Sequence, residues 1–395
     1  MKWASYASDS DSLEQALDEC IAAVKGQLGT DAPDLAVVFV SPHHSEGYDL
    51  LPQRVKDKLA PRHMVGCSAG GVIGGGHEIE QRAGFSLTGA VLPGVEITPF
   101  HVENESLPDL DAAPNSWESL VHTSPAKEPK FLLITDPLTI QSDNLLLGLD
   151  YAFADSVKIG GMASGGQNPG GNALILDDQV YRSGAVGLAF HGDIVIDTIV
   201  AQGCRPIGKP LNITKSQQNL LLELDGKPAL EVLRELYESL DEGDRKLLRH
   251  SLFLGVVMDE FQDDPQLGDF LIRNIVGMDT RAGALAVGER LREGQIVQFH
   301  LRDALTSAED LSALVCRYRD DERDSRVAGA LLFSCLGRGM YLYGRPDHDT
   351  EIFRNALGEI PLGGFFCNGE IGPVQGTTYL HGYTSSFGLF RPLGK

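Results

Sequence analysis

A glycine-rich window that occurs three times constrains this chain more than any other feature of its sequence. The windows cover residues 65–71, 160–166 and 363–369. Aligned without gaps, each has glycine at its second and seventh positions, with small or apolar residues dominating between them. Glycine weakens a strand, so a glycine inside one marks a bulge, a bend or a close approach of another group to the backbone. Three copies therefore indicate one geometric requirement that is met three times.

An apolar run and then a helical segment precede each window. These pairs are residues 35–40 and 50–59, 131–134 and 145–154, and 330–334 and 350–357. The pattern predicts a strand, a helix and a glycine-rich strand used three times. The run at 35–40 has no polar alternation, which is typical of a strand that is buried on both faces.

Pairs of further strand-like segments recur after the windows. Residues 83–92 and 95–102 are separated by Pro93 and Gly94, which predicts a hairpin. Residues 183–190 with 193–200, and 282–287 with 296–301, repeat that pattern, and a last strand pair is expected within 377–390. Amphipathic spacing predicts a helix over 10–28, and a capping-box pattern predicts another over 307–318.

These elements predict an α+β fold with mixed or antiparallel sheets flanked by helices, built from repeated strand–helix–strand–hairpin units. A doubly wound parallel fold fits less well, because hairpins are antiparallel. Residues 225–228 break the pattern before a new helix, and we place a domain boundary there.

Composition excludes several classes of function. The net charge is −22 and no basic stripe occurs, so we expect no nucleic-acid partner. No run of eighteen apolar residues occurs, which argues against a membrane span, and the N-terminus lacks the apolar segment of a signal peptide. The six cysteines are scattered without a Cys-x-x-Cys pair or zinc-finger spacing. We therefore expect a cytoplasmic protein with no metal or cofactor.

Two motifs come close to catalytic or phosphate-binding signatures. Residues 66–70 match the Gly-x-Ser-x-Gly elbow of hydrolases, which would make Ser68 a nucleophile, with the thiol of Cys67 as the alternative. That elbow needs a helix after the turn, and residues 72–76 are poor helix sequence. Residues 203–210 imitate a phosphate-binding loop but end in proline where the motif needs Ser or Thr. We predict that the chain is not an enzyme, with a hydrolase as the third choice of function.

The windows and their surroundings resemble the FIST family, named for F-box and intracellular signal transduction proteins. The resemblance is carried by residues 65–76 with Glu78 and Glu80, by 160–166, by 225–230, and by 363–376 followed by 381–384. It implies a FIST N-terminal domain over 30–225 and a FIST C-terminal domain over 226–395, after an N-terminal helix in 1–29. It also implies a sensory module that binds a small ligand, with amino acids proposed for the family. About thirty residues before the first domain are too few for an F-box, so we expect a stand-alone module that signals through a separate protein partner.

The expected ligand is an amino acid or a small carboxylate, and its candidate site is the ends of the windows. Exposed amides and polar side chains there could bind carboxylate or ammonium groups. The candidates are Ser68, Gly70, Gly71, Ser164, Gly165, Gly166, Asn368, Glu370 and His381. Two alternatives stay open: the windows only pack closely against neighbouring strands, or the chain is an adaptor that recognises another protein.

Overall fold

The structure is a computed structural model of the chain, and it describes residues 1–29, 32–259, 265–321 and 324–394. It divides into two compact units, each described by itself below. Unit 1 comprises Met1–Val200 and Ser312–Lys395, and unit 2 comprises Ala201–Leu311. These units combine segments differently from the sequential domains expected at 1–29, 30–225 and 226–395, and residue 30 lies outside the described residues.

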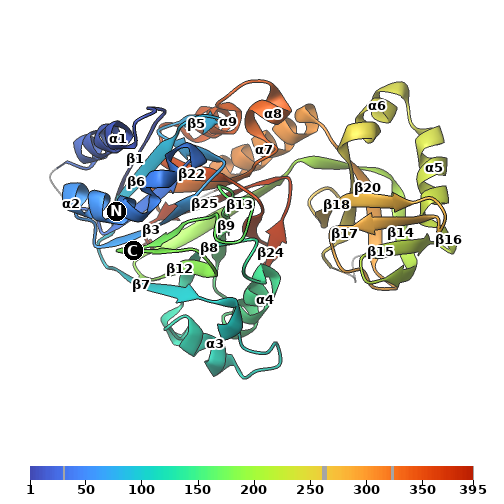
Figure 1. Cartoon of the computed structure of the whole chain (residues 1–395), viewed down its shortest axis with the longest axis horizontal. Coiled ribbons are helices and arrows are strands. Elements are labelled where there is room, and N and C mark those ends of the chain that lie inside the picture. Colours follow the sequence, from blue (N-terminus) through green and yellow to red (C-terminus); the bar gives the residue numbers. More distant parts are fainter. Residues whose placement is uncertain (30–31, 260–264, 322–323, 395) are drawn as a thin grey trace. The chain divides into compact units, whose positions relative to one another are not determined.

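Unit 1, part of whose strands are labelled in Figure 1, contains three sheets. The strand orders of the three sheets correspond to one another. Sheet 1 has the order β1 (Lys2–Ser8), β6 (Phe85–Val91), β2 (Leu35–Val40), β3 (His63–Ser68), β10 (Leu174–Leu176) and β11 (Gln179–Tyr181). Sheet 2 has the order β7 (Val95–Val102), β12 (Ala185–Gly192), β8 (Lys130–Thr135), β9 (Lys158–Met162), β23 (Glu370–Val374) and β24 (Thr377–His381). Sheet 3 has the order β13 (Val195–Gln202), β25 (Thr384–Arg391), β21 (Gly329–Cys335), β22 (Leu362–Cys367), β4 (Gly71–Gly74) and β5 (His77–Glu80).

Each sheet is built around one parallel strand pair: β2 with β3, β8 with β9, or β21 with β22. A hairpin from another part of the chain then pairs antiparallel with the glycine-rich strand. The hairpin β10–β11 extends sheet 1, β23–β24 extends sheet 2 and β4–β5 extends sheet 3. The α+β class with mixed and antiparallel sheets is confirmed. A hairpin does follow each strand–helix–strand unit, but these hairpins are β4–β5, β10–β11 and β23–β24 and not the ones predicted from the sequence.

Helices cover the outer faces of these sheets. They are α1 (Leu13–Leu28), η1 (Pro42–Leu50), α2 (Leu51–Leu59), η2 (Asn104–Ser106), α3 (Pro114–Leu120), η3 (Pro125–Lys127), α4 (Ser142–Ala152), α8 (Gly339–Tyr343) and α9 (His348–Leu357). Strand β2 shows how the layers form, because Leu35, Val37 and Phe39 enter a core shared by the three sheets. Ala36 and Val38, on its other face, pack under α1 and α2. Burial on both faces explains why this strand has no polar alternation.

The three windows correspond in the structure at Gly66, Gly160 and Gly364. Each of these glycines lies opposite an isoleucine of the added hairpin, and a Cβ on each would lie 1.8–1.9 Å from a carbonyl oxygen of the neighbouring parallel strand. The ungapped alignment had placed Gly161 at this position, which is wrong by one residue. The glycines are required because backbone meets backbone, which leaves no space for a side chain.

The predicted hairpins are wrong, although most of their strands form. Strand β6 lies in sheet 1 and β7 in sheet 2, while β12 lies in sheet 2 and β13 in sheet 3. The expected C-terminal pair also separates, with β24 in sheet 2 and β25 in sheet 3. In each case the chain turns out of one sheet and continues in the next.

Unit 2 is an antiparallel barrel with helices packed on it. Its order is β14 (Cys204–Gln217), β20 (Ile296–Arg302), β17 (Leu252–Val257), β18 (Phe270–Asp279), β19 (Ala284–Val287), β15 (Leu220–Leu224) and β16 (Lys227–Pro228), and β14 also pairs with β15, which closes the ring. The predicted hairpin at 282–301 is wrong because β19 and β20 pair with other strands. Helix α5 (Ala229–Ser239) packs on β15 and β19, and α6 (Glu242–Ser251) packs on β20.

Helix α7 (Ala304–Asp320) begins before the predicted residue 307. Asp303 caps it, accepting hydrogen bonds from the backbone N–H and the hydroxyl of Thr306 at 2.8 Å each. Ser307 is buried instead and donates to the carbonyl of Gly203. Throughout the described part of the chain, no helix has the length and apolar character that a membrane crossing would need.

Candidate functional site

The ends of the three windows meet and hydrogen-bond to one another. The Ser68 carbonyl accepts from the N–H groups of Ser164 and Gly165, at 3.3 and 3.2 Å. The Gly70 N–H donates to the Ser164 hydroxyl at 2.9 Å, and that hydroxyl donates to the Phe366 carbonyl. A Cβ on Gly165 would lie 2.6 Å from the Cβ of Ser68. These polar groups therefore join one window to the next.

The other predicted window residues also have partners within the protein. The side-chain amide of Asn368, an exposed residue, donates to the Ala163 carbonyl at 3.0 Å. The Gly166 N–H donates to Asn172, at 2.7 Å. Gly71 is buried, and a Cβ there would lie 2.8 Å from the ring of Phe366.

Glu370 and His381 lie opposite each other on β23 and β24. Both side chains are buried. Glu370 accepts from the Thr384 N–H at 3.1 Å, and the His381 ring contacts the Gly372 carbonyl at 3.0 Å. The structure thus places these two predicted residues together, within a hydrogen-bonded sheet.

The hydrolase hypothesis required Ser68 or Cys67 within hydrogen-bonding distance of a histidine. Ser68 instead donates to Asn172 Oδ1 at 3.1 Å and accepts from the Ala173 N–H at 2.9 Å. Cys67 is fully buried, and burial raises the pKa of its thiol well above the usual range. A buried neutral thiol is a poor nucleophile. The observed contacts therefore give neither residue an activating base.

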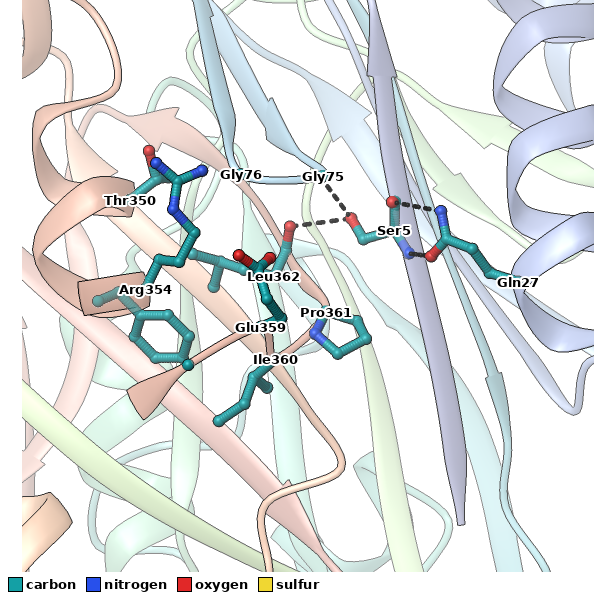
Figure 2. Close-up of a pocket in the computed structure, with 12 residues that line it drawn as sticks. Ser5, Gln27, Gly75, Gly76, Thr350, Arg354, Glu359, Ile360, Pro361 and Leu362 are labelled. Carbon is teal, nitrogen blue, oxygen red and sulfur yellow. Dashed lines mark hydrogen bonds between the residues drawn. The ribbon is translucent and has the colours of Figure 1, made fainter. Parts of the chain in front are cut away.

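A cavity of about 310 Å³ lies elsewhere in unit 1 (Figure 2). Its walls come from β1, α1, the turn between β4 and β5, and the segment from α9 into β22. The lining residues are Ser5, Gln27, Gly75, Gly76, Thr350, Phe353, Arg354, Gly358, Glu359, Ile360, Pro361 and Leu362. The volume lies at the lower end of the range of about 300–1,000 Å³ for small-molecule sites. None of the residues predicted from the windows lines this cavity.

Ser5 holds the walls of the cavity together. Its hydroxyl donates to the Leu362 carbonyl at 2.9 Å and accepts from the Gly75 N–H at 3.3 Å. The Gln27 side chain hydrogen-bonds both the N–H and the carbonyl of Ser5, at 3.3 Å each. Gly75 and Gly76 have φ values of +61° and +83°, so glycine suits both positions of this tight turn. These contacts fix β1, α1 and the turn around one opening.

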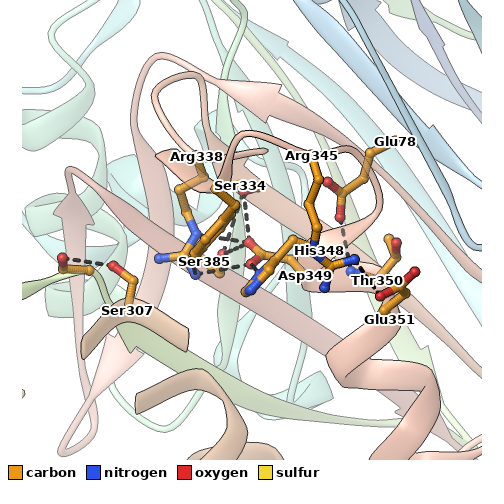
Figure 3. Close-up of polar contacts among 12 residues, drawn as sticks. Glu78, Ser307, Ser334, Arg338, Arg345, His348, Asp349, Thr350, Glu351 and Ser385 are labelled. Carbon is orange, nitrogen blue, oxygen red and sulfur yellow. Dashed lines mark hydrogen bonds and ion pairs between the residues drawn. The ribbon is translucent and has the colours of Figure 1, made fainter. Parts of the chain in front are cut away.

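A buried ion pair stands beside the cavity at the start of α9. Asp349 accepts from Arg338 Nε at 2.8 Å and Nη2 at 3.1 Å, and from the Ser385 hydroxyl at 2.6 Å (Figure 3). Burial alone would raise the pKa of the Asp349 carboxyl, but the Arg338 guanidinium and the hydrogen bonds around it hold that pKa well below its usual range. Asp349 is therefore ionised and paired.

Glu78 connects this charged cluster to the cavity wall. Its Oε1 accepts from the Thr350 N–H at 2.9 Å, and Thr350 lines the cavity. Burial, followed by the nearby negative charge of Asp349, raises the pKa of Glu78 to about 8. Both causes favour the protonated form of Glu78. The sequence resemblance had named Glu78 without a role.

Nothing in the sequence distinguished Thr350 and Arg354 from ordinary residues of a helix surface. Their spacing of four residues on α9 places them on one helix face, which was the available signal. No group of three or more His, Cys, Asp or Glu side chains within the described ranges is arranged to hold a metal ion.

Comparison with known proteins places this architecture in a family. The FIST N domain matches residues 34–227, and the FIST C domain matches residues 229–373. An uncharacterized protein of Mycobacterium tuberculosis is 35% identical over 386 residues, which cover 97% of this chain and 98% of the relative. An uncharacterized protein of Mycobacterium bovis is 35% identical over 379 residues, or 95% of each chain. An F-box/LRR-repeat protein of Arabidopsis thaliana is 25% identical over 280 residues, which cover 62% of this chain and 52% of that protein. From the two domain matches and the near full-length relatives, the chain belongs to the FIST family.

Proposed function

We propose that this chain is a cytoplasmic signal-transduction module that binds a small ligand, an amino acid or a small carboxylate, in the cavity of unit 1. FIST domains are generally sensory and signal-transduction domains. The observation that carries the proposal is the cavity of about 310 Å³, which is walled by segments far apart in the sequence. A ligand there would contact β1, the β4–β5 turn and α9 together, and would favour the arrangement in which they meet. On this proposal the chain is a binding protein, not an enzyme.

The ligand-binding role of the window residues stays a prediction. The Ser68 carbonyl and the side chains of Ser164 and Asn368 make contacts between windows, and the Ser68 hydroxyl is taken up by Asn172. A ligand at that junction would have to replace those contacts, whereas the cavity offers space that is already formed. This difference supports placing the ligand in the cavity.

Native mass spectrometry of the freshly purified protein, followed by a thermal-shift screen of amino acids and small carboxylates, tests the proposal. A ligand that binds only the folded state at a concentration of 100 Kd stabilises it by about 2.7 kcal/mol. Ile360→Trp fills the cavity with a larger side chain and should abolish the shift. Leu138→Trp, at an exposed position outside the cavity, is the control. The proposal fails if no mass co-purifies and no compound shifts the transition, or if Ile360→Trp leaves the shift intact.

Protein recognition is the second candidate function, and one observation favours it. Leu336, Met340 and Tyr341 expose 37%, 43% and 78% of their surfaces at and before α8. Exposed apolar side chains are typical of recognition surfaces. A photo-crosslinking residue at position 341 should capture a partner protein. The same residue should capture less of that partner when the chain also carries Met340→Ser. Equal capture by that variant would argue against this surface.

A further inference from the structure

The side chains of α9 that face the cavity leave hydrogen-bond donors available inside it. Thr350 and Arg354 are four residues apart on α9 and line the same cavity. Thr350 is 1% exposed, and within the described residues its hydroxyl has no hydrogen-bond partner. A buried hydroxyl without a partner is disfavoured, so it marks a position where a bound group could supply an acceptor.

Arg354 as a whole residue is half-buried, and it lines the same wall of the cavity. Among the side chains that the structure describes, none forms an ion pair with it. Arginine presents a planar set of donors that matches the two oxygens of a carboxylate. Together, the Arg354 guanidinium and the Thr350 hydroxyl can donate to one oxyanion from a single helix face.

The rest of the lining restricts the kind of anion. Glu359 also lines the cavity, and its carboxylate repels an anion with two negative charges more strongly than an anion with one. Phe353, Ile360 and Leu362 give the walls an apolar part, where a short carbon chain can be buried.

We propose that the cavity is a site for small organic monocarboxylates, anchored by Arg354 and Thr350. This inference rests on the proposed function and names the ligand class and the binding groups of the same site. The carboxylate accepts hydrogen bonds from the guanidinium and the hydroxyl, and the carbon chain packs towards the apolar wall.

Isothermal titration of the full chain with butyrate, butyramide and inorganic phosphate tests the inference. Butyrate should bind saturably. Butyramide, which has a similar shape and no charge, should bind at least tenfold more weakly. Phosphate should also bind more weakly than butyrate because of its second charge beside Glu359. Equal affinity for butyramide, or no saturable binding of butyrate, overturns the inference.

Two variants test whether Arg354 and Thr350 bind the carboxylate. Arg354→Gln should weaken butyrate binding by about tenfold or more, and Thr350→Val should weaken it several-fold. Arg345→Gln is the matched control, because it removes the same charge from an exposed ion pair with Glu351 outside the cavity. Unchanged butyrate affinity in Arg354→Gln overturns the assignment of Arg354.

The same variants separate this inference from the proposed function. If the broad screen finds a ligand that Ile360→Trp excludes and Arg354→Gln still binds, the cavity is a ligand site and the carboxylate assignment is wrong. If Ile360→Trp excludes nothing, the proposed function itself fails at this cavity.

Discussion

Separating the buried Arg338–Asp349 pair should destabilise unit 1 strongly. Asp349→Asn removes the negative charge with little change in shape, and leaves the fully buried guanidinium of Arg338 without its counter-charge. Breaking a buried pair from one side costs about 3–5 kcal/mol. At about 2 °C per kcal/mol for a unit of this size, the melting temperature should fall by roughly 6–10 °C. Arg338→Met should cost a similar amount, because the buried carboxylate of Asp349 loses the guanidinium that balances its charge, although the hydroxyls of Ser334 and Ser385 still donate to it.

The double variant Arg338→Met with Asp349→Leu tests the reasoning most sharply. Independent losses would add to about 6–10 kcal/mol, from the two single values above. Because neither charge remains buried in the double variant, it should be no less stable than either single variant. Some loss should persist, since the hydroxyls of Ser334 and Ser385 lose the acceptor they share.

Urea unfolding followed by tryptophan fluorescence measures these differences in unit 1 specifically. Both tryptophans of the chain, Trp3 and Trp117, lie in unit 1 and are 4% and 0% exposed. Glu351→Gln, which breaks the exposed pair with Arg345, is the control and should cost less than about 1 kcal/mol. A loss below about 1 kcal/mol in Asp349→Asn, or additive losses in the double variant, would refute the reasoning.

Three further predictions follow from close contacts and from shifted pKa values. Gly364→Ala should prevent unit 1 from folding, because the new Cβ would lie 1.9 Å from a backbone oxygen. In Gly26→Ala, within α1, the new Cβ meets nothing within 4 Å, so this variant should raise the free energy of unfolding by about 0.5–1 kcal/mol. Soluble yield and urea unfolding check both outcomes. The pKa of Glu78 is raised to about 8 from 4.5, so the stability that protonated Glu78 contributes is lost as pH rises through 8. Urea unfolding between pH 5 and 9 should therefore show a smaller loss of stability in Glu78→Gln than in the unchanged protein. Burial lowers the pKa of His300 to about 4 from 6.5, so unit 2 should lose stability as pH falls from 6.5 towards 4. Hydrogen exchange of β17 and β20 should therefore show less acid-induced opening in His300→Leu than in the unchanged protein. Equal opening in the two proteins would contradict this prediction.

The sequence predicted those features of the fold that depend on local pattern. The apolar run at 35–40 forms β2, which is buried on both faces, and the first part of each glycine window forms a strand in which one glycine lies against neighbouring backbone. The hairpins were predicted wrongly because a turn such as that at Pro93 and Gly94 shows where the chain reverses, but not with which strand the next segment pairs. Whether the next strand joins the same sheet depends on contacts with segments about one hundred residues away, such as those between β7 and β12.

The candidate site was harder to predict than the fold. The window residues stood out because glycine repeats are visible in a sequence, and the structure brings those windows together. Thr350 and Arg354 became notable only when β1 and the β4–β5 turn closed a cavity over their helix face. A missing partner is a property of the folded surroundings, so no local pattern could show it.

The way unit 1 assembles its sheets has a consequence for its integrity. Each sheet keeps its own central strands and borrows its outer hairpin from another segment, so the three are interlocked in a ring. Strand β1 fills the edge of sheet 1 that corresponds to β7 in sheet 2 and β13 in sheet 3, so the first strand of the chain completes the ring. Removing any one of these segments would leave unpaired strand edges in the neighbouring sheets, and exposed strand edges can pair with other chains. No third of unit 1 is therefore a self-sufficient fragment, and the cavity lies at the seam where the beginning of the chain meets its last helix.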